Sequence, residues 1–126
     1  MKLLLGLFAL MLAVGLLAFL ASRVAPSGPE CKDRVLAESR SPEDRFIATS
    51  FERTCGAQVA TAVGLRLSEG PFTGAEKDTV FVAPGQVAVR LLWREELQFV
   101  IESKAQAVAR EESSWRKVQV TLRRLR

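Results

Sequence analysis

The chain has 126 residues, of which 48% are hydrophobic, with 18 lysines and arginines against 14 aspartates and glutamates. It contains no histidine and no tyrosine, so it lacks the commonest general base and the commonest nitrogen ligand for metals near neutral pH. An apolar N-terminal segment leaves about 100 residues, which suffice for one domain but not for a second independent core.

The apolar segment begins at Leu3 and ends at Ala21. Its 19 residues include nine leucines and no charged or polar side chain. As a helix with a rise of about 1.5 Å per residue it reaches close to 30 Å, the thickness of a bilayer's hydrocarbon core. A cleaved signal has a shorter apolar region of about 7 to 15 residues, so length favours an uncleaved anchor over residues 1–22. Cleavage near Ala25 and Ser27, followed by secretion, is the alternative.

The charges beside this segment do not decide its orientation, because Lys2 on one flank competes with Arg23, Lys32 and Arg34 on the other. The two cysteines indicate the orientation instead, because a disulfide is expected in an oxidising compartment. We therefore expect residues 31–126 to lie on the periplasmic side of a bacterial cytoplasmic membrane.

Residues 23–30 are predicted to be an extended linker, since two prolines and a glycine oppose helix formation there. Beyond it, apolar residues recur mostly with period two, which indicates strands with one buried face. The expected strands cover residues 45–53, 59–68, 87–94, 97–101 and 117–123. Turn residues lie at 41–44, 69–71, 83–86 and 95–96. Residues 103–112 fit a helical turn or a strand equally well.

The same alternation assigns faces to the strands. Val89, Leu91 and Trp93 face one way, and Arg90 and Arg94 the other. In the last strand the inward set is Val118, Val120 and Leu122, and the outward set is Lys117, Gln119, Thr121 and Arg123. The predicted fold is therefore mainly β, an antiparallel meander over residues 31–126 that closes into a sandwich or a partial barrel.

Residues 41–48 read Ser-Pro-Glu-Asp-Arg-Phe-Ile-Ala and resemble the Ser-Pro-Asp-Gly-Arg-Tyr-Ile-Ala hairpin of β-propeller blades. Asp44 stands where the motif has glycine, which argues against a left-handed residue at this position. A propeller needs at least four blades of about 40 residues, and this domain holds two at most.

A longer part of the chain is similar to small uncharacterised bacterial exported or membrane-anchored β-domain proteins. In that group a cysteine, a Ser-Pro-Asp-Gly-Arg turn and a Cys-Gly-Ala segment follow one another. The matching residues here are Cys31, residues 41–45 and residues 55–57, with further similarity over 80–82 and 91–102. The resemblance implies no reaction, cofactor or catalytic residue.

Cys31 and Cys55 are predicted to form a structural disulfide, which for a separation of 24 residues contributes about 3 kcal/mol in the chain-entropy model. Two cysteines without histidine make a poor metal site, and no Cys-x-x-Cys motif is present for redox chemistry. We therefore expect neither a metal nor another cofactor.

Four glutamates are candidates for general acid and base pairs: Glu95, Glu96, Glu111 and Glu112. Neighbours on a strand point to opposite faces, so a solvated turn is the preferred interpretation. A nucleophilic Ser113 or Ser114 would need a lysine base such as Lys104, and nothing in the spacing supports that pairing. No catalytic residue and no small-molecule substrate are predicted.

The last eleven residues contain five cations: Arg116, Lys117, Arg123, Arg124 and Arg126. They could contact an anionic membrane surface or an acidic partner, whereas nucleic acid is not expected outside the cytoplasm. A solvated strand face with a basic tail is the plainer interpretation.

These observations predict a non-enzymatic, membrane-tethered extracytoplasmic domain that serves as an accessory or protein-interaction module. Its contacts would be the membrane, through residues 3–21, and a membrane protein. The alternative is a small domain that binds an envelope polymer or anionic lipid through its basic terminal strand.

Overall fold

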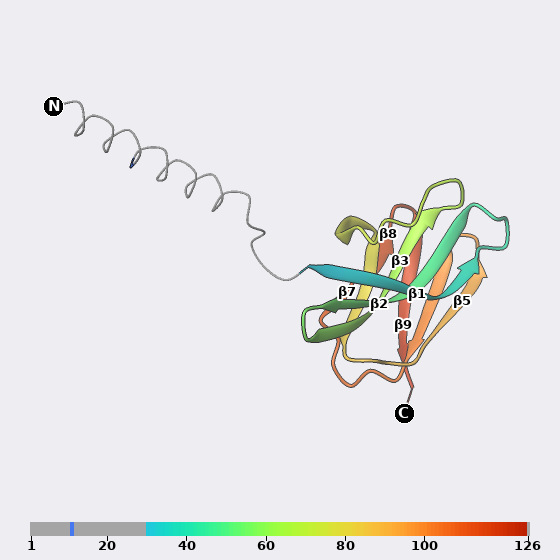
Figure 1. Ribbon diagram of the computed structural model, residues 1–126. Coiled ribbons are helices and arrows are strands. Elements are labelled where there is room, and N and C mark those ends of the chain that lie inside the picture. The colour runs from blue at the N-terminus through green and yellow to red at the C-terminus, as the bar shows by residue number, and fades with distance from the viewer. Residues whose placement is uncertain (1–10, 12–29, 126) are drawn as a thin grey trace.

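The computed structural model describes Met11 and residues 30–125 (Figure 1). The predicted anchor and linker lie outside the described residues, apart from Met11 and Glu30. Over the part of the chain that is described, no helix is both long and apolar enough to cross a membrane.

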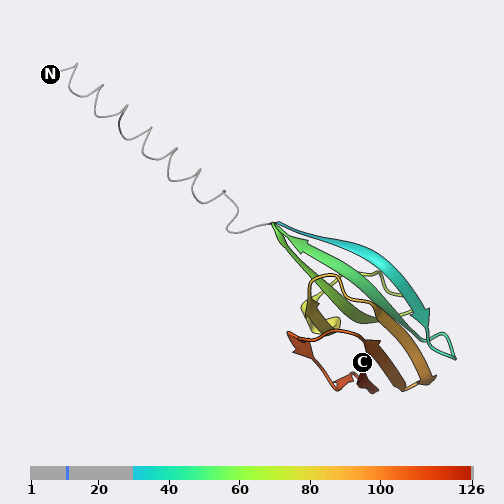
Figure 2. The same cartoon turned by 90° about the horizontal axis from the view of Figure 1, so that it is seen from below.

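Two β-sheets pack face to face as a sandwich (Figure 2). The five-stranded sheet has the order β1 (Cys31–Arg40), β2 (Phe46–Cys55), β3 (Gln58–Leu67), β4 (Thr79–Pro84) and β7 (Arg110–Glu111). The four-stranded sheet has the order β5 (Val89–Glu95), β6 (Gln98–Ser103), β9 (Val118–Arg124) and β8 (Ser114–Trp115). A short 3₁₀ helix, η1 (Glu76–Asp78), precedes β4. The mainly β architecture is thus confirmed.

One strand pair departs from the expected antiparallel meander, because β6 and β9 run parallel. Parallel neighbours require a crossover connection. Here the chain leaves β6, pairs as β7 with β4 in the opposite sheet, and returns through β8. The undecided segment over 103–112 supplies this crossover and forms no helix.

The core lies between the sheets and uses the faces that the alternation assigned. Phe46 and Ala48 of β2 meet Phe99 and Ile101 of β6 and the valines of β9. The ring of Phe46 lies 6.2 Å from that of Trp93 and 5.9 Å from that of Trp115, centroid to centroid. The two indole N–H groups are satisfied, by the Ser39 carbonyl at 3.1 Å and by the Asp78 carboxylate at 2.9 Å. Both tryptophans are therefore structural.

The outer face of β2 is buried as well, which alternation did not predict. Ile47, Thr49 and Phe51 are at most 2% exposed although they point away from the other sheet. The connection from β3 to β4, residues 68–78, folds back over this face, and Phe72 packs edge-on against Phe51 at 5.0 Å between ring centroids. The five-stranded sheet is therefore covered on both sides at β2.

The turn before β2 corrects one prediction. Asp44 has φ of 63°, so it adopts the left-handed conformation that the missing glycine had argued against. Aspartate tolerates this conformation better than most residues. The Asp44 N–H donates to the Ser41 carbonyl at 2.9 Å, and this hydrogen bond closes a turn over residues 41–44.

Candidate functional site

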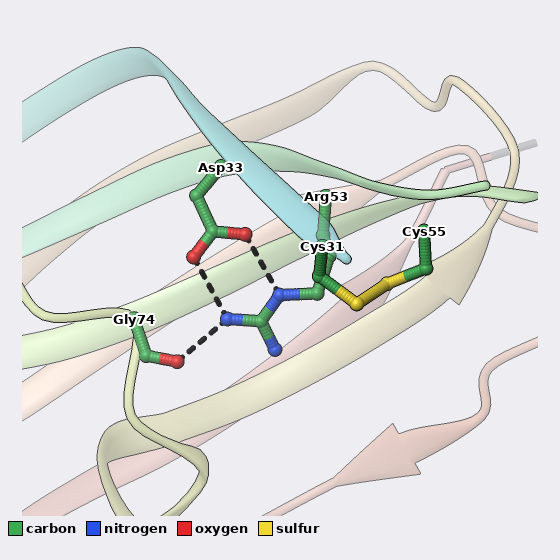
Figure 3. The surroundings of a disulfide bond; sticks show 5 residues. All are labelled: Cys31, Asp33, Arg53, Cys55 and Gly74. Carbon is green, nitrogen blue, oxygen red and sulfur yellow. Dashed lines mark hydrogen bonds and ion pairs between the residues drawn. A yellow bond between two sulfur atoms is a disulfide. The ribbon is translucent and has the colours of Figure 1, made fainter. Parts of the chain in front are cut away.

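The disulfide joins the first residue of β1 to the last residue of β2 (Figure 3). Cys31 and Cys55 face each other directly in the strand register, with their Cα atoms 4.2 Å apart. Gly56, with φ of 63°, then turns the chain into β3. The predicted pairing is confirmed.

Two residues from the disulfide on each strand, Arg53 of β2 binds Asp33 of β1 in a bidentate ion pair (Figure 3). The Nε–Oδ1 distance is 2.7 Å and the Nη2–Oδ2 distance is 2.9 Å. Nη2 also donates to the Gly74 carbonyl at 2.6 Å. The hydrogen bond to Asp33 raises the pKa of Arg53 against the opposing effect of burial, with the charges of Asp33 and Glu76 adding to it. The guanidinium therefore stays protonated.

Arg66 repeats this arrangement at the other end of the loop. It donates to the Gly70 carbonyl at 2.6 Å and pairs with Glu38 of β1 at 3.1 Å. Each arginine thus holds the 68–78 loop through a carbonyl and β1 through a carboxylate. β1 needs such links, because all its residues except Ser39 are exposed and none belongs to the buried core.

Glu96, in the turn between β5 and β6, links the two sheets. Its carboxylate accepts from Ser41 Oγ at 2.9 Å, from the Glu43 N–H at 2.8 Å and from the Arg45 N–H at 3.3 Å. Desolvation acts to raise the pKa of Glu96, but these three hydrogen bonds and the Arg45 charge together lower it below its usual value. Glu96 therefore organises the turn between β1 and β2 from the opposite sheet.

Ion pairing divides the arginines between the two sheets, whereas Lys32 and Lys77 on the five-stranded side form no ion pair with a described residue. Among residues 30–125, every arginine of the five-stranded sheet and its turns pairs with a carboxylate: Arg34, Arg40, Arg45, Arg53, Arg66 and Arg110. The four-stranded sheet and its flanking turns carry seven cations, and none forms an ion pair with a described residue: Arg90, Arg94, Lys104, Arg116, Lys117, Arg123 and Arg124.

The outer face of the four-stranded sheet gathers several of these cations. One cross-strand row contains Arg90, Glu102 and Arg123, on β5, β6 and β9. At about 4.8 Å between strands, the two arginine backbones lie roughly 10 Å apart. The next row is uncharged and contains Leu92, Val100 and Thr121. The row beyond it contains Glu95, Gln98 and Gln119. We call these three rows together with Arg94 the basic face.

The predicted basic cluster at the end of the chain is not one patch. Arg116 and Lys117 precede β9, while Arg123 and Arg124 end it, so an extended strand separates the pairs by roughly 20 Å. Arg126 lies outside the described residues. Arg116 instead stacks on Trp115, 5.0 Å from the ring centroid. Sequence reasoning missed Arg90 and Arg94 as site residues, although their outward orientation was predicted.

The four candidate acid and base glutamates do not lie together. Glu95 and Glu96 belong to the hairpin of β5 and β6, whereas Glu111 and Glu112 lie in and after β7 in the other sheet. Glu112 is paired with Arg110 at 3.5 Å. Within residues 30–125, no group of three or more histidine, cysteine, aspartate or glutamate residues could hold a metal ion.

An open groove of about 460 Å³ lies beside the disulfide, between β3 and β4 on the outer face of the five-stranded sheet. Its lining includes Val59, Ala60, Val82 and Pro84. Arg53 also borders it, but that guanidinium is already bound to Asp33 and Gly74. The basic face is therefore the better candidate for a functional site.

No known protein family, no curated protein and no solved structure matches the chain.

Replacing both cysteines, as Cys31→Ser with Cys55→Ser, should lower the free energy of unfolding by about 3 kcal/mol, because the unfolded chain regains the freedom of a long loop. Chemical denaturation of the variant and of the oxidised protein measures the difference. Equal midpoints would show that the hydrogen bonds of β1 suffice without the disulfide.

Gly74→Ala should be more destabilising than Gly85→Ala by about 1 to 3 kcal/mol, the usual cost of overpacking. Both glycines have positive φ, but an added Cβ at Gly74 collides with the Asp33 carboxylate, whereas at Gly85 it meets open space. Thermal unfolding of the two variants isolates the clash from the backbone strain. Equal losses would mean that the Arg53 and Asp33 pair moves aside freely.

Glu96→Gln should destabilise the domain at neutral pH, while Glu95→Gln, the matched control at the exposed neighbouring residue, should not. Because the folded-state pKa of Glu96 is lowered, its stabilisation is present above the unfolded value of about 4.3 and is lost as pH falls through the folded value. Denaturation curves from pH 7 down to pH 3 should therefore converge for wild type and Glu96→Gln. A constant gap across this range would contradict a role for the carboxylate charge.

Proposed function

We propose that the chain is a non-enzymatic, membrane-tethered extracytoplasmic accessory domain that acts by contacting another protein. The observation that carries this proposal is the difference between the two outer faces of the sandwich. The five-stranded sheet covers its outer face at β2 with a loop held by Arg53 and Arg66. The four-stranded sheet carries arginines on its outer face that form no ion pair with a described carboxylate.

The composition of the basic face supports a protein contact. Leu92 is half-buried and Val100 beside it is only 4% exposed, Gln119 and Thr121 offer hydrogen-bonding groups, and arginines border them. Arginine is enriched in protein interfaces, which combine an apolar centre with a polar rim. The face therefore has the chemistry of a contact surface.

The tether is supported by the length of the apolar segment over residues 3–21. The extracytoplasmic location is supported by the disulfide, since such bonds persist in oxidising compartments. β1, where the described domain begins, belongs to the sheet opposite the basic face (Figure 2).

The alternative is a domain that binds an envelope polymer or anionic lipid. This binding would use the five cations of the basic terminal strand. The four of them that are described fall into two pairs at opposite ends of β9. These cations do not form one compact site, and the alternative stays a prediction.

Photocrosslinking of the full chain in its native membrane tests the proposed function. A photoreactive residue at Thr121, on the basic face, should give a discrete crosslink to a second protein. The same residue at Thr73, on the loop that covers the other sheet, is the matched control and should give little. Only uncrosslinked chain from both positions would contradict an interaction module.

A further inference from the structure

We infer that the basic face docks an acidic protein surface, and that Arg90, Arg94 and Arg123 recognise its carboxylates. The inference rests on the proposed function and adds the chemistry of the partner. It concerns residues of β5 and β9, which lie on either side of β6 in the same sheet (Figure 1).

The charge of this face calls for a complementary partner. Arg90 and Arg123 flank Glu102 in one row, yet no ion pair forms among the three in the structure. All three arginines are exposed. A guanidinium presents a planar fork of donors that matches a carboxylate with two parallel hydrogen bonds. The three side chains are therefore available to external carboxylates, unlike the arginines of the five-stranded sheet.

The pattern favours a protein over an anionic bilayer. Lipid recognition typically uses clusters of four to eight lysines and arginines. Here Glu102 lies in the middle of the charged row, and the neighbouring row is uncharged. Arginine rather than lysine supplies the positive charge at all three positions, as at protein interfaces, where lysine is depleted.

A second copy of the chain fits this face less well. The five-stranded sheet carries the acidic side chains Asp33, Glu38 and Glu52, but each is already bound to an arginine of the same sheet. Docking there would exchange existing ion pairs for new ones with little gain. We assign the free carboxylates to a different protein. Because Glu95 and Glu102 lie on the basic face itself, a second copy is an outcome that the mass of the crosslinked product tests.

Charge-neutralising variants of the full chain test this inference with the photoreactive residue at Thr121. The triple variant Arg90→Gln, Arg94→Gln and Arg123→Gln should reduce the yield of the crosslink to the second protein about tenfold or more, the effect of losing about 1.4 kcal/mol of binding free energy. The matched control is Arg34→Gln, Arg40→Gln and Arg45→Gln, which removes the same charge from exposed, paired arginines. Its yield should stay within about twofold of wild type, because exposed ion pairs contribute little.

A lipid arm distinguishes the other source of negative charge. The full chain is placed in nanodiscs of phosphatidylcholine alone or with one third phosphatidylglycerol, and amide hydrogen exchange is followed over residues 90–102 and 118–124. The inference expects equal exchange in both. Slower exchange in the anionic nanodiscs would overturn it in favour of a membrane surface.

Three crosslinking results would overturn the inference while leaving the proposed function in place. They are a yield unaffected by the basic-face triple variant, an equal loss in both triple variants, and a product at twice the mass of the chain, which would indicate a second copy. Thermal unfolding and intact disulfide formation in both variants confirm that the comparison is between folded proteins. Wild-type chain that gives no crosslink from either position contradicts the proposed function itself.

Discussion

Burial of both faces of β2 is the constraint on which the rest of this structure depends. Residues 46–51 are all buried, so one set of side chains faces the opposite sheet and the other needs a separate cover. The 68–78 loop supplies that cover through Phe72 but contains little regular structure of its own. Full burial of a large apolar side chain contributes about 1.5 to 3 kcal/mol, so this second, smaller core matters in a domain of about 100 residues.

Charged side chains hold the irregular 68–78 loop against the sheet. Arg53 and Arg66 bind the loop carbonyls, and Asp33 and Glu38 on β1 hold the two guanidinium groups in position. These contacts commit the arginines and much of the acidic charge of the five-stranded sheet to internal pairs. The four-stranded sheet packs one face on the core between the sheets. Its outward arginines hold no loop and form no ion pair with a described residue. The asymmetry between the faces is thus a consequence of how the first sheet is stabilised.

Sequence patterns predicted local structure well and long-range order poorly. Alternation placed Val118, Val120 and Leu122 inward, because side-chain direction along a strand depends only on neighbouring residues. It did not assign β1, whose side chains are nearly all exposed, or the cover over Phe51, which depends on contacts with residues 68–78. The basic face required knowing that β6 and β9 pair in parallel, since only that pairing brings Arg90 and Arg123 into one row. The role of Glu96 was hidden for the same reason, as its partners lie more than fifty residues earlier.

The position of the disulfide also determines how the domain responds to tension. A pull on the chain before Glu30 acts on the first residue of an edge strand, a geometry that would peel β1 from β2 one hydrogen bond at a time. Cys31 is that first residue, and its covalent bond to Cys55 passes the force directly to the hairpin of β2 and β3. β3 is paired on both sides within its sheet, so the load is spread over two strand ladders in parallel. The disulfide therefore protects this edge strand from peeling under a pull on its N-terminal end.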